Sequence, residues 1–369
     1  GRRTGRVPGG GGVELDATGK VNVTGVGAVM KINETLIQRI WEENKEGHEF
    51  FIEESYVIPW MYPYLTPYGL IMKLHAEPLE GGIPEDLIAQ DFAYWEELIE
   101  ELVARPEYHR DEMAPRTFAK LRSSMGGLYL YWANRLREGR MYEYAERALR
   151  ESLELYRPLP EANYRLAELL VQLDRQEDAL AVIDGYWEED PMNARIPAIR
   201  QRIEASKELR DEAKRLLARL EGEPEDVEGL FALARAYGMR NMFIEANAAV
   251  NRLLELRTDD ATVGRIIRLY AELGRPNEQA QLMEELVRRH PEEWRQRLEL
   301  AGLYASQGMV EESLRHLREA TKVGGYPARE AVTKDRRFEY LYDRPDAAAL
   351  FGEMGISILP RAVPGGRIE

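Results

Sequence analysis

Residues 160–191 read PEANYRLAELLVQLDRQEDALAVIDGYWEEDP, and they decide the fold class of the chain. Leu166 and Ala167 lie in the first apolar stretch, a turn is expected at Asp174, and Ala179 lies in the second stretch before Pro191. Apolar residues recur at helical spacing on both sides of the turn, and proline marks where a helix stops. The stretch therefore predicts two short helices that pack against each other as a hairpin.

The same pattern returns along the chain at a nearly constant spacing. Residues 260–291 and 294–325 are close copies, and two weaker copies lie around Gly139 and Met239. The expected turn residues are Gly139, Asp174, Met239, Gly274 and Gly308. These positions are about 34 residues apart, except for one step of about twice that length. The long step contains a charged helical stretch at residues 194–220, which we interpret as a spacer helix in place of one repeat.

Helix pairs that recur at this length resemble the tetratricopeptide repeat (TPR) family over about residues 114–351. The resemblance implies an α-solenoid, because one helix pair is too small to bury its own apolar face and must stack on the next. Small residues such as Ala167 and Ala301 are expected where two helices approach closely. The last repeat is expected to carry a C-terminal cap, with apolar residues at Phe338, Leu341 and Leu350.

The chain before the repeats predicts a different structure. Residues 1–28 are rich in Gly and Arg at the start and then alternate weakly, which indicates a flexible arm or a short hairpin around residues 16–19. Residues 29–80 predict a small α/β module, with a helix over 29–44 followed by strands over 49–52 and 69–74.

A connecting helix is expected over residues 81–113, and a tail over residues 352–369. The predicted fold class is therefore mostly α. It is a TPR-like α-solenoid preceded by a small α/β module and a Gly-rich N-terminal arm.

A second and narrower resemblance covers residues 49–77 and the end of the helix before them. The residues that carry it are Asn44-Lys45, Phe50-Phe51, Tyr64-Leu65, Pro67 and Gly69-Leu70. This segment is similar to the water-exposed C-terminal region of bacterial membrane proteins related to protein O-mannosyltransferases (DUF2723-type). The resemblance implies a location outside the cytoplasm. It carries over no catalytic residue, because the membrane-spanning part of that family is absent from this sequence.

The composition limits the class of partner. Lys and Arg total 50 and Asp and Glu total 65, which gives a formal net charge of −15 at pH 7. Binding to phosphates needs a basic face, so this balance argues against a nucleic-acid partner. The chain has no cysteine, which excludes disulfides and thiolate chemistry.

No apolar run approaches the roughly 18 residues of a membrane span. The sequence begins at Gly1 rather than Met. We therefore expect a processed precursor, with a membrane anchor as one alternative, or a piece of a longer protein.

No motif predicts a catalytic, cofactor or metal site. Gly19 and Lys20 are followed by Val21 rather than Ser or Thr, so the Gly-rich start does not match a phosphate-binding loop. The five histidines are scattered and form no His-x-x-x-His pair, whereas a metal site needs ligands that converge on one point. We therefore expect a protein that is not an enzyme, that binds no cofactor or metal, and whose partner is another protein.

The densest feature outside the repeats is an aromatic and proline-rich run. It contains Trp60, Tyr62, Tyr64 and Tyr68. Aromatic faces stack on sugars and peptides, so one interpretation is a binding platform. We favour a packing wedge that docks the N-terminal module on the first helices, because large aromatic side chains are highly buried on average.

The inner face of the solenoid is the remaining candidate for binding. In TPR proteins the first helix of each repeat lines the concave face, and the matching positions here include Tyr164, Glu168, Arg268, Arg295 and Leu298. The Lys and Asn residues that would clamp a peptide carboxylate are missing there. Small residues and mixed charge favour a segment of another protein lying in the groove.

Two functions from different classes follow. The first is a non-catalytic interaction or scaffold protein that assembles with itself, head to tail through its N-terminal arm, into an extracellular filament or another homopolymer. The alternative is the soluble extracytoplasmic tail of a membrane glycosyltransferase-like enzyme. Both place the protein outside the cytoplasm, in the periplasm, at the cell surface or in the extracellular space.

Overall fold

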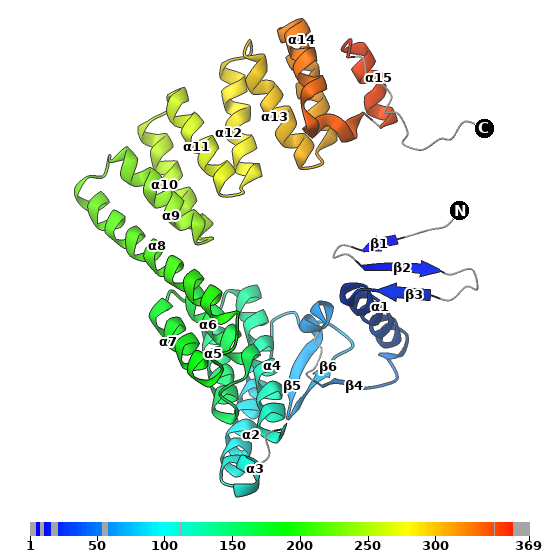
Figure 1. Cartoon of the computed structure of the whole chain (residues 1–369), viewed down its shortest axis with the longest axis vertical. Helices are drawn as coiled ribbons and strands as arrows, with labels where there is room; N and C mark the ends of the chain where they lie inside the picture. The colour runs from blue at the N-terminus through cyan, green and yellow to red at the C-terminus, as the bar shows by residue number, and fades with distance from the viewer. Residues whose placement is uncertain are drawn as a thin grey trace. The chain divides into compact units, whose positions relative to one another are not determined.

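The computed structural model describes residues 5–7, 11–15, 21–53, 58–110, 113–342 and 344–356. The chain divides into two compact units, Gly1–Lys207 and Glu208–Glu369. In each unit, helices joined by short turns form successive pairs, as Figure 1 shows. The predicted fold class, a TPR-like α-solenoid behind a small module that contains strands, is confirmed.

Unit 1 begins with a three-stranded antiparallel sheet. It contains β1 (Gly5–Val7), β2 (Gly11–Leu15) and β3 (Val21–Thr24), in that order, with Val13 opposite Val23. The expected turn at residues 16–19 lies outside the described residues. The sequence pattern does not predict β1, because this strand has no alternation of apolar residues. An antiparallel ladder is made by backbone groups, which glycine also supplies.

Helix α1 (Val26–Asn44) leads from this sheet to a second one. The second sheet contains β4 (Phe50–Ile52), β5 (Leu65–Tyr68) and β6 (Ile71–Leu74), all antiparallel, in the order β4-β6-β5. The 3-10 helix η2 (Pro59–Tyr64) precedes β5. Strand β5 contains Pro67 and was not predicted. It lies at the edge of the sheet, where a missing backbone N–H leaves no central ladder bond unmade.

Helices α2 (Glu85–Val103) and α3 (Pro106–Arg110) precede two helix pairs of unit 1. These pairs are α4 (Met113–Leu136) with α5 (Gly139–Leu155), and α6 (Pro160–Gln172) with α7 (Gln176–Glu189). Helices α4 and α5 approach closely at Gly126, where a Cβ atom would lie 2.8 Å from Leu149 Cγ. The charged stretch expected as a spacer forms α8 (Ile196–Gly222), a single long helix that begins in unit 1 and ends in unit 2.

Unit 2 contains three further pairs and a cap. The pairs are α9 (Val227–Met239) with α10 (Phe243–Leu256), α11 (Asp260–Glu272) with α12 (Pro276–Arg289), and α13 (Trp294–Ser306) with α14 (Val310–Lys334). A kink at Gly325, with φ 58°, interrupts α14. The cap consists of η3 (Arg336–Leu341) and α15 (Pro345–Glu353). Phe338, Leu341 and Leu350 are buried in the core that these elements share with α13 and α14.

The turns inside the helix pairs each contain a residue with a left-handed backbone. These residues are Arg137, Asp174, Asn241, Gly274 and Gly308. The prediction is wrong by two residues in the first and third cases, because Gly139 begins α5 and Met239 ends α9. Asp and Asn adopt this conformation more readily than other side chains, whereas Arg137 adopts it against the usual preference.

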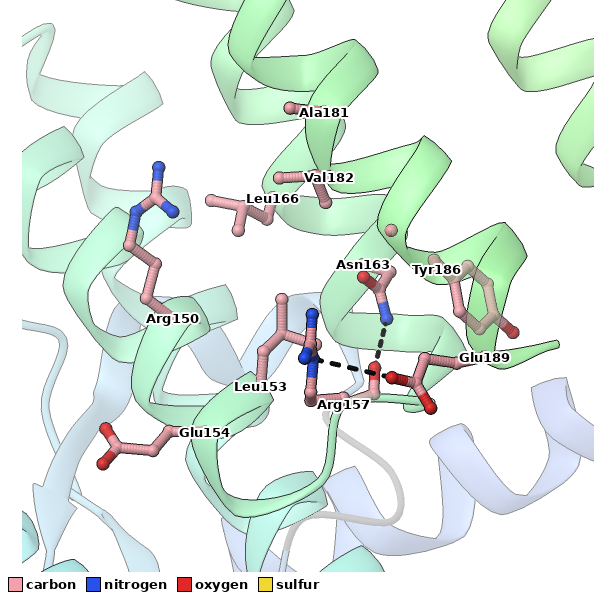
Figure 2. Close-up of a pocket in the computed structure, with 11 residues that line it drawn as sticks. Arg150, Leu153, Glu154, Arg157, Asn163, Leu166, Ala181, Val182, Tyr186 and Glu189 are labelled. Carbon is pink, nitrogen blue, oxygen red and sulfur yellow. Dashed lines mark hydrogen bonds and ion pairs between the residues drawn. The ribbon is translucent and has the colours of Figure 1, made fainter.

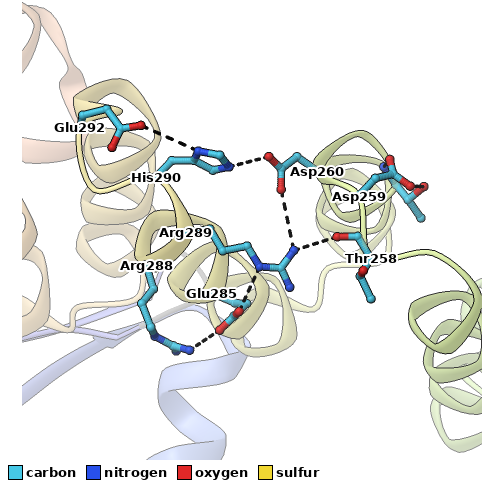
Figure 3. A network of polar contacts seen from close by, with 9 residues as sticks. Thr258, Asp259, Asp260, Glu285, Arg288, Arg289, His290 and Glu292 are labelled. Atoms are coloured by element: carbon cyan, nitrogen blue, oxygen red, sulfur yellow. Dashed lines mark hydrogen bonds and ion pairs between the residues drawn. The ribbon is translucent and has the colours of Figure 1, made fainter.

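Polar contacts join the start of α11 to the end of α12, as shown in Figure 3. Asp259 accepts a hydrogen bond from the Thr262 N–H at 3.0 Å and so caps α11. His290 Nε2 lies 2.5 Å from Asp260 Oδ2, and Arg289 donates to the Thr258 carbonyl at 2.8 Å. These contacts close the pair at the end opposite its turn, which fixes how the two helices lie together.

Candidate functional site

The first helices of two repeats in unit 2 form a shallow polar hollow. Its volume is about 260 Å³, and it lies between α9 and α11. The lining residues are Glu228, Phe231, Ala232, Arg235, Arg265, Arg268, Leu269 and Glu272. This hollow occupies the face on which the TPR resemblance places a peptide groove.

Most of the charged side chains that line this hollow are paired with one another. Arg265 donates two hydrogen bonds of 2.7 Å to Glu228, and its guanidinium lies 4.0 Å from the centre of the Phe231 ring. The hydrogen bond from Arg265 lowers the pKa of Glu228 below its usual range. Arg235 pairs with Glu272 at 3.0 Å. Among the described residues, exposed Arg268 has no ion-pair partner, so it gives the hollow one cation for a carboxylate of a bound segment.

The other predicted groove residues do not gather at this hollow. Tyr164 is half-buried, with its hydroxyl 3.2 Å from Asn193 Oδ1, and Glu168 is exposed on α6. Exposed Arg295 lies over the Trp294 ring at 4.7 Å. Leu298 is 7% exposed and belongs to the core, so its side chain is not available to a partner.

The last repeat covers its own inner face. A Cβ atom at Gly302 on α13 would overlap the guanidinium of Arg337, which comes from the cap. Arg337 donates to Asp335 and, at 3.0 Å, to Glu299, and the hydrogen bond with Asp335 is the main cause that raises its pKa well above the usual range. The cap therefore covers the inner face at Gly302, which the sequence does not predict, whereas Arg295 stays exposed.

The larger hollows of unit 1 all involve α5, the second helix of its first pair, which the sequence does not predict. Figure 2 shows one of about 460 Å³ between α5 and α7. Asn163, which is buried, donates to the carbonyl groups of Arg157 and Leu159 at 2.8 and 2.9 Å. Arg157 pairs loosely with Glu189 at 3.7 Å. Small residues Ala181 and Gly185 leave the space open between the helices.

Three of the four predicted aromatic residues pack inside unit 1. Trp60 and Tyr64 lie 5.1 and 5.0 Å from the ring of Trp41 on α1. Tyr62 stacks on Tyr131 of α4, with ring centres 4.9 Å apart. Tyr68 differs, because it is 59% exposed. Trp60 and Tyr64 therefore pack inside the N-terminal module, Tyr62 joins that module to α4, and Tyr68 remains open at the edge of the second sheet.

Within the part of the chain that the structure describes, no group of three or more His, Asp or Glu residues could hold a metal ion. No helix in the described ranges is both long and apolar enough to cross a membrane. One histidine cluster lies in unit 2, where His316 Nε2 and the Tyr304 hydroxyl both lie 3.0 Å from Glu284 Oε1. This cluster joins α12, α13 and α14, which is a packing role.

We expect the pH dependence of unit 2 to reveal this buried histidine. Burial lowers the pKa of His316, although Glu284 opposes the shift, while Arg315 and Arg297 add to it. The unfolded chain therefore takes up the proton first, and the stability of unit 2 should fall as the pH drops below about 6.5. Hydrogen exchange of peptides from α12 to α14 between pH 7.5 and 5.5 measures this.

The change His316→Gln should flatten that dependence. His75→Gln is the matched control, because burial also lowers the pKa of His75, but this residue lies in unit 1, directly after β6. An equal pH dependence in wild-type protein and His316→Gln would contradict the assignment.

The known proteins that resemble this chain do so at low sequence identity. No protein-family model and no curated protein matches the chain. Among solved structures, YrrB, a TPR protein with an unusual peptide-binding site, is 16% identical with a TM-score of 0.25, over 56% of this chain and 90% of that one. MamA is 15% identical with a TM-score of 0.22, over 53% and 96%. The TPR domain of P58(IPK) is 15% identical with a TM-score of 0.23, over 75% and 71%.

The solenoid is TPR-like. This assignment rests on the helix pairs of the chain, their turns and their spacing. The resemblance of residues 49–77 to the O-mannosyltransferase-related proteins finds no match in these comparisons and stays a prediction.

Proposed function

We propose that this chain is a non-catalytic interaction and scaffold protein that assembles head to tail through its N-terminal region. The observation that carries the proposal is an exposed apolar stripe on α1. Val29, Leu36 and Ile40 are 45%, 54% and 55% exposed, and Met30 and Ile37 lie beside them at 42% and 38%. Residues 29, 36 and 40 share one face of a helix, and contiguous apolar surface of this kind marks contact with another protein.

The solenoid supplies the surface on which such a contact is made. Stacked helix pairs expose long faces on both their first and second helices, and the hollows of unit 1 and unit 2 lie on these faces. A stripe at one end of the chain that contacts a different surface on the next copy is a heterologous contact. Repetition of that contact gives a ring or an open filament. We place this assembly outside the cytoplasm.

Light scattering on the full chain tests the proposal. We expect a mass that is a multiple of 42.5 kDa and that grows with concentration. Removal of residues 1–28, or the double change Leu36→Glu with Ile40→Glu, should return the monomer mass. The matched control, Thr35→Glu with Gln38→Glu, adds the same two negative charges on the other side of α1 and should leave assembly intact.

A full chain that stays monomeric at all concentrations would contradict self-assembly. The alternative function, a soluble tail of a membrane glycosyltransferase-like enzyme, would then gain weight. A membrane-spanning region encoded directly upstream in the same gene would support that alternative.

A further inference from the structure

We propose that an acidic groove between α2 and α5 binds the basic N-terminal segment, residues 1–12, of a second copy of this chain. This inference rests on the proposed function and names the surface that receives the segment. The groove has a volume of about 460 Å³. The lining residues are Glu96, Ile99, Glu100, Val103, Ala104, Glu151 and Glu154.

The groove combines an apolar floor with carboxylates on both sides. Val103 is 38% exposed, whereas Ile99 below it is 7% exposed. The charged side chains that line the groove are all glutamates, two from α2 and two from α5. This arrangement suits an extended peptide whose aliphatic stems lie on the floor while its cations reach the rims.

Two of the four carboxylates are already neutralised. Arg147 pairs with Glu96 at 3.1 Å and with Glu151 at 2.7 Å, and buried Arg122 also contacts Glu151. Glu100 and Glu154 have no ion-pair partner among the residues that the structure describes. They leave two negative charges, one on each helix of the groove, for an incoming cation.

The groove continues along α3, where the buried hydroxyl of Tyr108 lacks a hydrogen-bond acceptor among the described residues. A second hollow of about 450 Å³ shares Val103 and Glu154 with the first and is also lined by Tyr108. Tyr108 is 6% exposed, and within the described residues its hydroxyl has no hydrogen-bond partner. Burial raises the pKa of Tyr108 to about 12, so the hydroxyl is a donor at neutral pH. A backbone carbonyl of an extended segment would accept this bond.

Arg110 and Arg157 also line this second hollow, so its charge is mixed and the acidic part is confined to the first. The proposed segment matches both parts, and its binding in the groove would replace the antiparallel pairing of β1 with β2. Residues 1–12, GRRTGRVPGGGG, contain Arg2, Arg3 and Arg6, no acidic residue and six glycines, in a chain whose net charge is −15. Arginine forms paired hydrogen bonds with carboxylates, and glycines let a backbone lie close to a groove wall.

The test uses the full chain and a labelled synthetic peptide of residues 1–12. We expect the peptide to bind the chain, and binding to weaken at least 10-fold with Glu100→Arg and Glu154→Arg together. The control pair Glu221→Arg and Glu225→Arg, at exposed positions outside the groove, should leave binding unchanged. Tyr108→Phe should weaken binding less than the groove pair does.

Charge reversal on both sides identifies the partner. In light scattering, Arg2→Glu with Arg3→Glu should weaken assembly, and so should the groove pair alone. Combining the two sets of changes should restore assembly, because opposite charges then face each other again. High salt should weaken wild-type assembly.

The outcomes separate this inference from the proposed function. If removal of residues 1–28 abolishes assembly while the groove pair does not, the scaffold proposal stands and the assignment of this groove is overturned. If the wild-type chain is monomeric and the peptide does not bind, both fail. Peptide binding that the groove pair does not affect also overturns the assignment.

Discussion

Replacing Arg122 with Met should cost about 3–5 kcal/mol of the stability of unit 1. Arg122 on α4 is fully buried and donates to Asp91 at 2.7 Å and to Glu151 at 2.7 Å. Tyr129 also donates to Asp91, at 2.6 Å. Loss of the guanidinium would leave the Asp91 carboxylate buried with one neutral partner. Tryptophan fluorescence in urea measures the loss, because all tryptophans except Trp294 lie in unit 1.

An exposed arginine with similar bond lengths provides the matched control. Arg200 pairs with Asp184 at 2.8 Å and Glu204 at 2.7 Å, but its side chain is 44% exposed. Arg200→Met should cost less than about 1 kcal/mol, because water and salt screen exposed pairs. The double change Arg122→Met with Asp91→Leu should recover most of this stability. It removes the buried Asp91 carboxylate that Arg122→Met alone leaves without a cation. Equal losses for Arg122→Met and Arg200→Met would show that burial does not decide the effect.

Replacing Trp132 with Ala should also destabilise unit 1, by about 3–5 kcal/mol, because it opens a large cavity. Trp132 on α4 is fully buried, and the loop backbone packs on it, since a Cβ atom at Gly82 would lie 3.7 Å from the indole. The preceding residue, Tyr131, stacks on Tyr62. Helix α4 therefore contacts the loop before α2 and the N-terminal module with adjacent side chains.

The comparison for this variant is Trp187→Ala on α7, where the indole is 38% exposed. We expect a loss of about 1 kcal/mol or less, because a partly exposed side chain buries less apolar area on folding. Far-UV circular dichroism in urea suits both variants, since it does not depend on the tryptophan that is removed. If Trp132→Ala lowers the free energy of unfolding no more than Trp187→Ala does, Trp132 is not a central residue of the core of unit 1.

Two arginines, Arg122 and Arg337, take their roles from residues that are distant in the sequence. Arg122 and Arg337 look like ordinary surface residues in the sequence. One is buried between Asp91 and Glu151, and the other covers Gly302 on the last repeat. Only the packing of separate helices distinguishes them from exposed arginines such as Arg268.

The sequence was enough to predict the helix pairs, the long α8 and the apolar cap. It also predicted the positions of the turns to within two residues. Each of these features depends on contacts between residues close in the sequence. Periodicity reports which residues share a helix face, and left-handed turns favour Gly, Asp and Asn. The same local information places Leu36, Ile40 and Trp41 on one helix. Local sequence information does not predict that Trp41 is 4% exposed while its neighbour Ile40 is 55% exposed.

Exposure was decided by the tertiary structure alone. Leu298 has the position of a groove residue but lies in the core, and the hollows of unit 1 involve the second helix α5. The acidic groove at Glu100 and Glu154 exists because α2 and α5 lie side by side, although about 50 residues separate their carboxylates. Which faces meet is set by packing between distant segments, and no local periodicity contains that information.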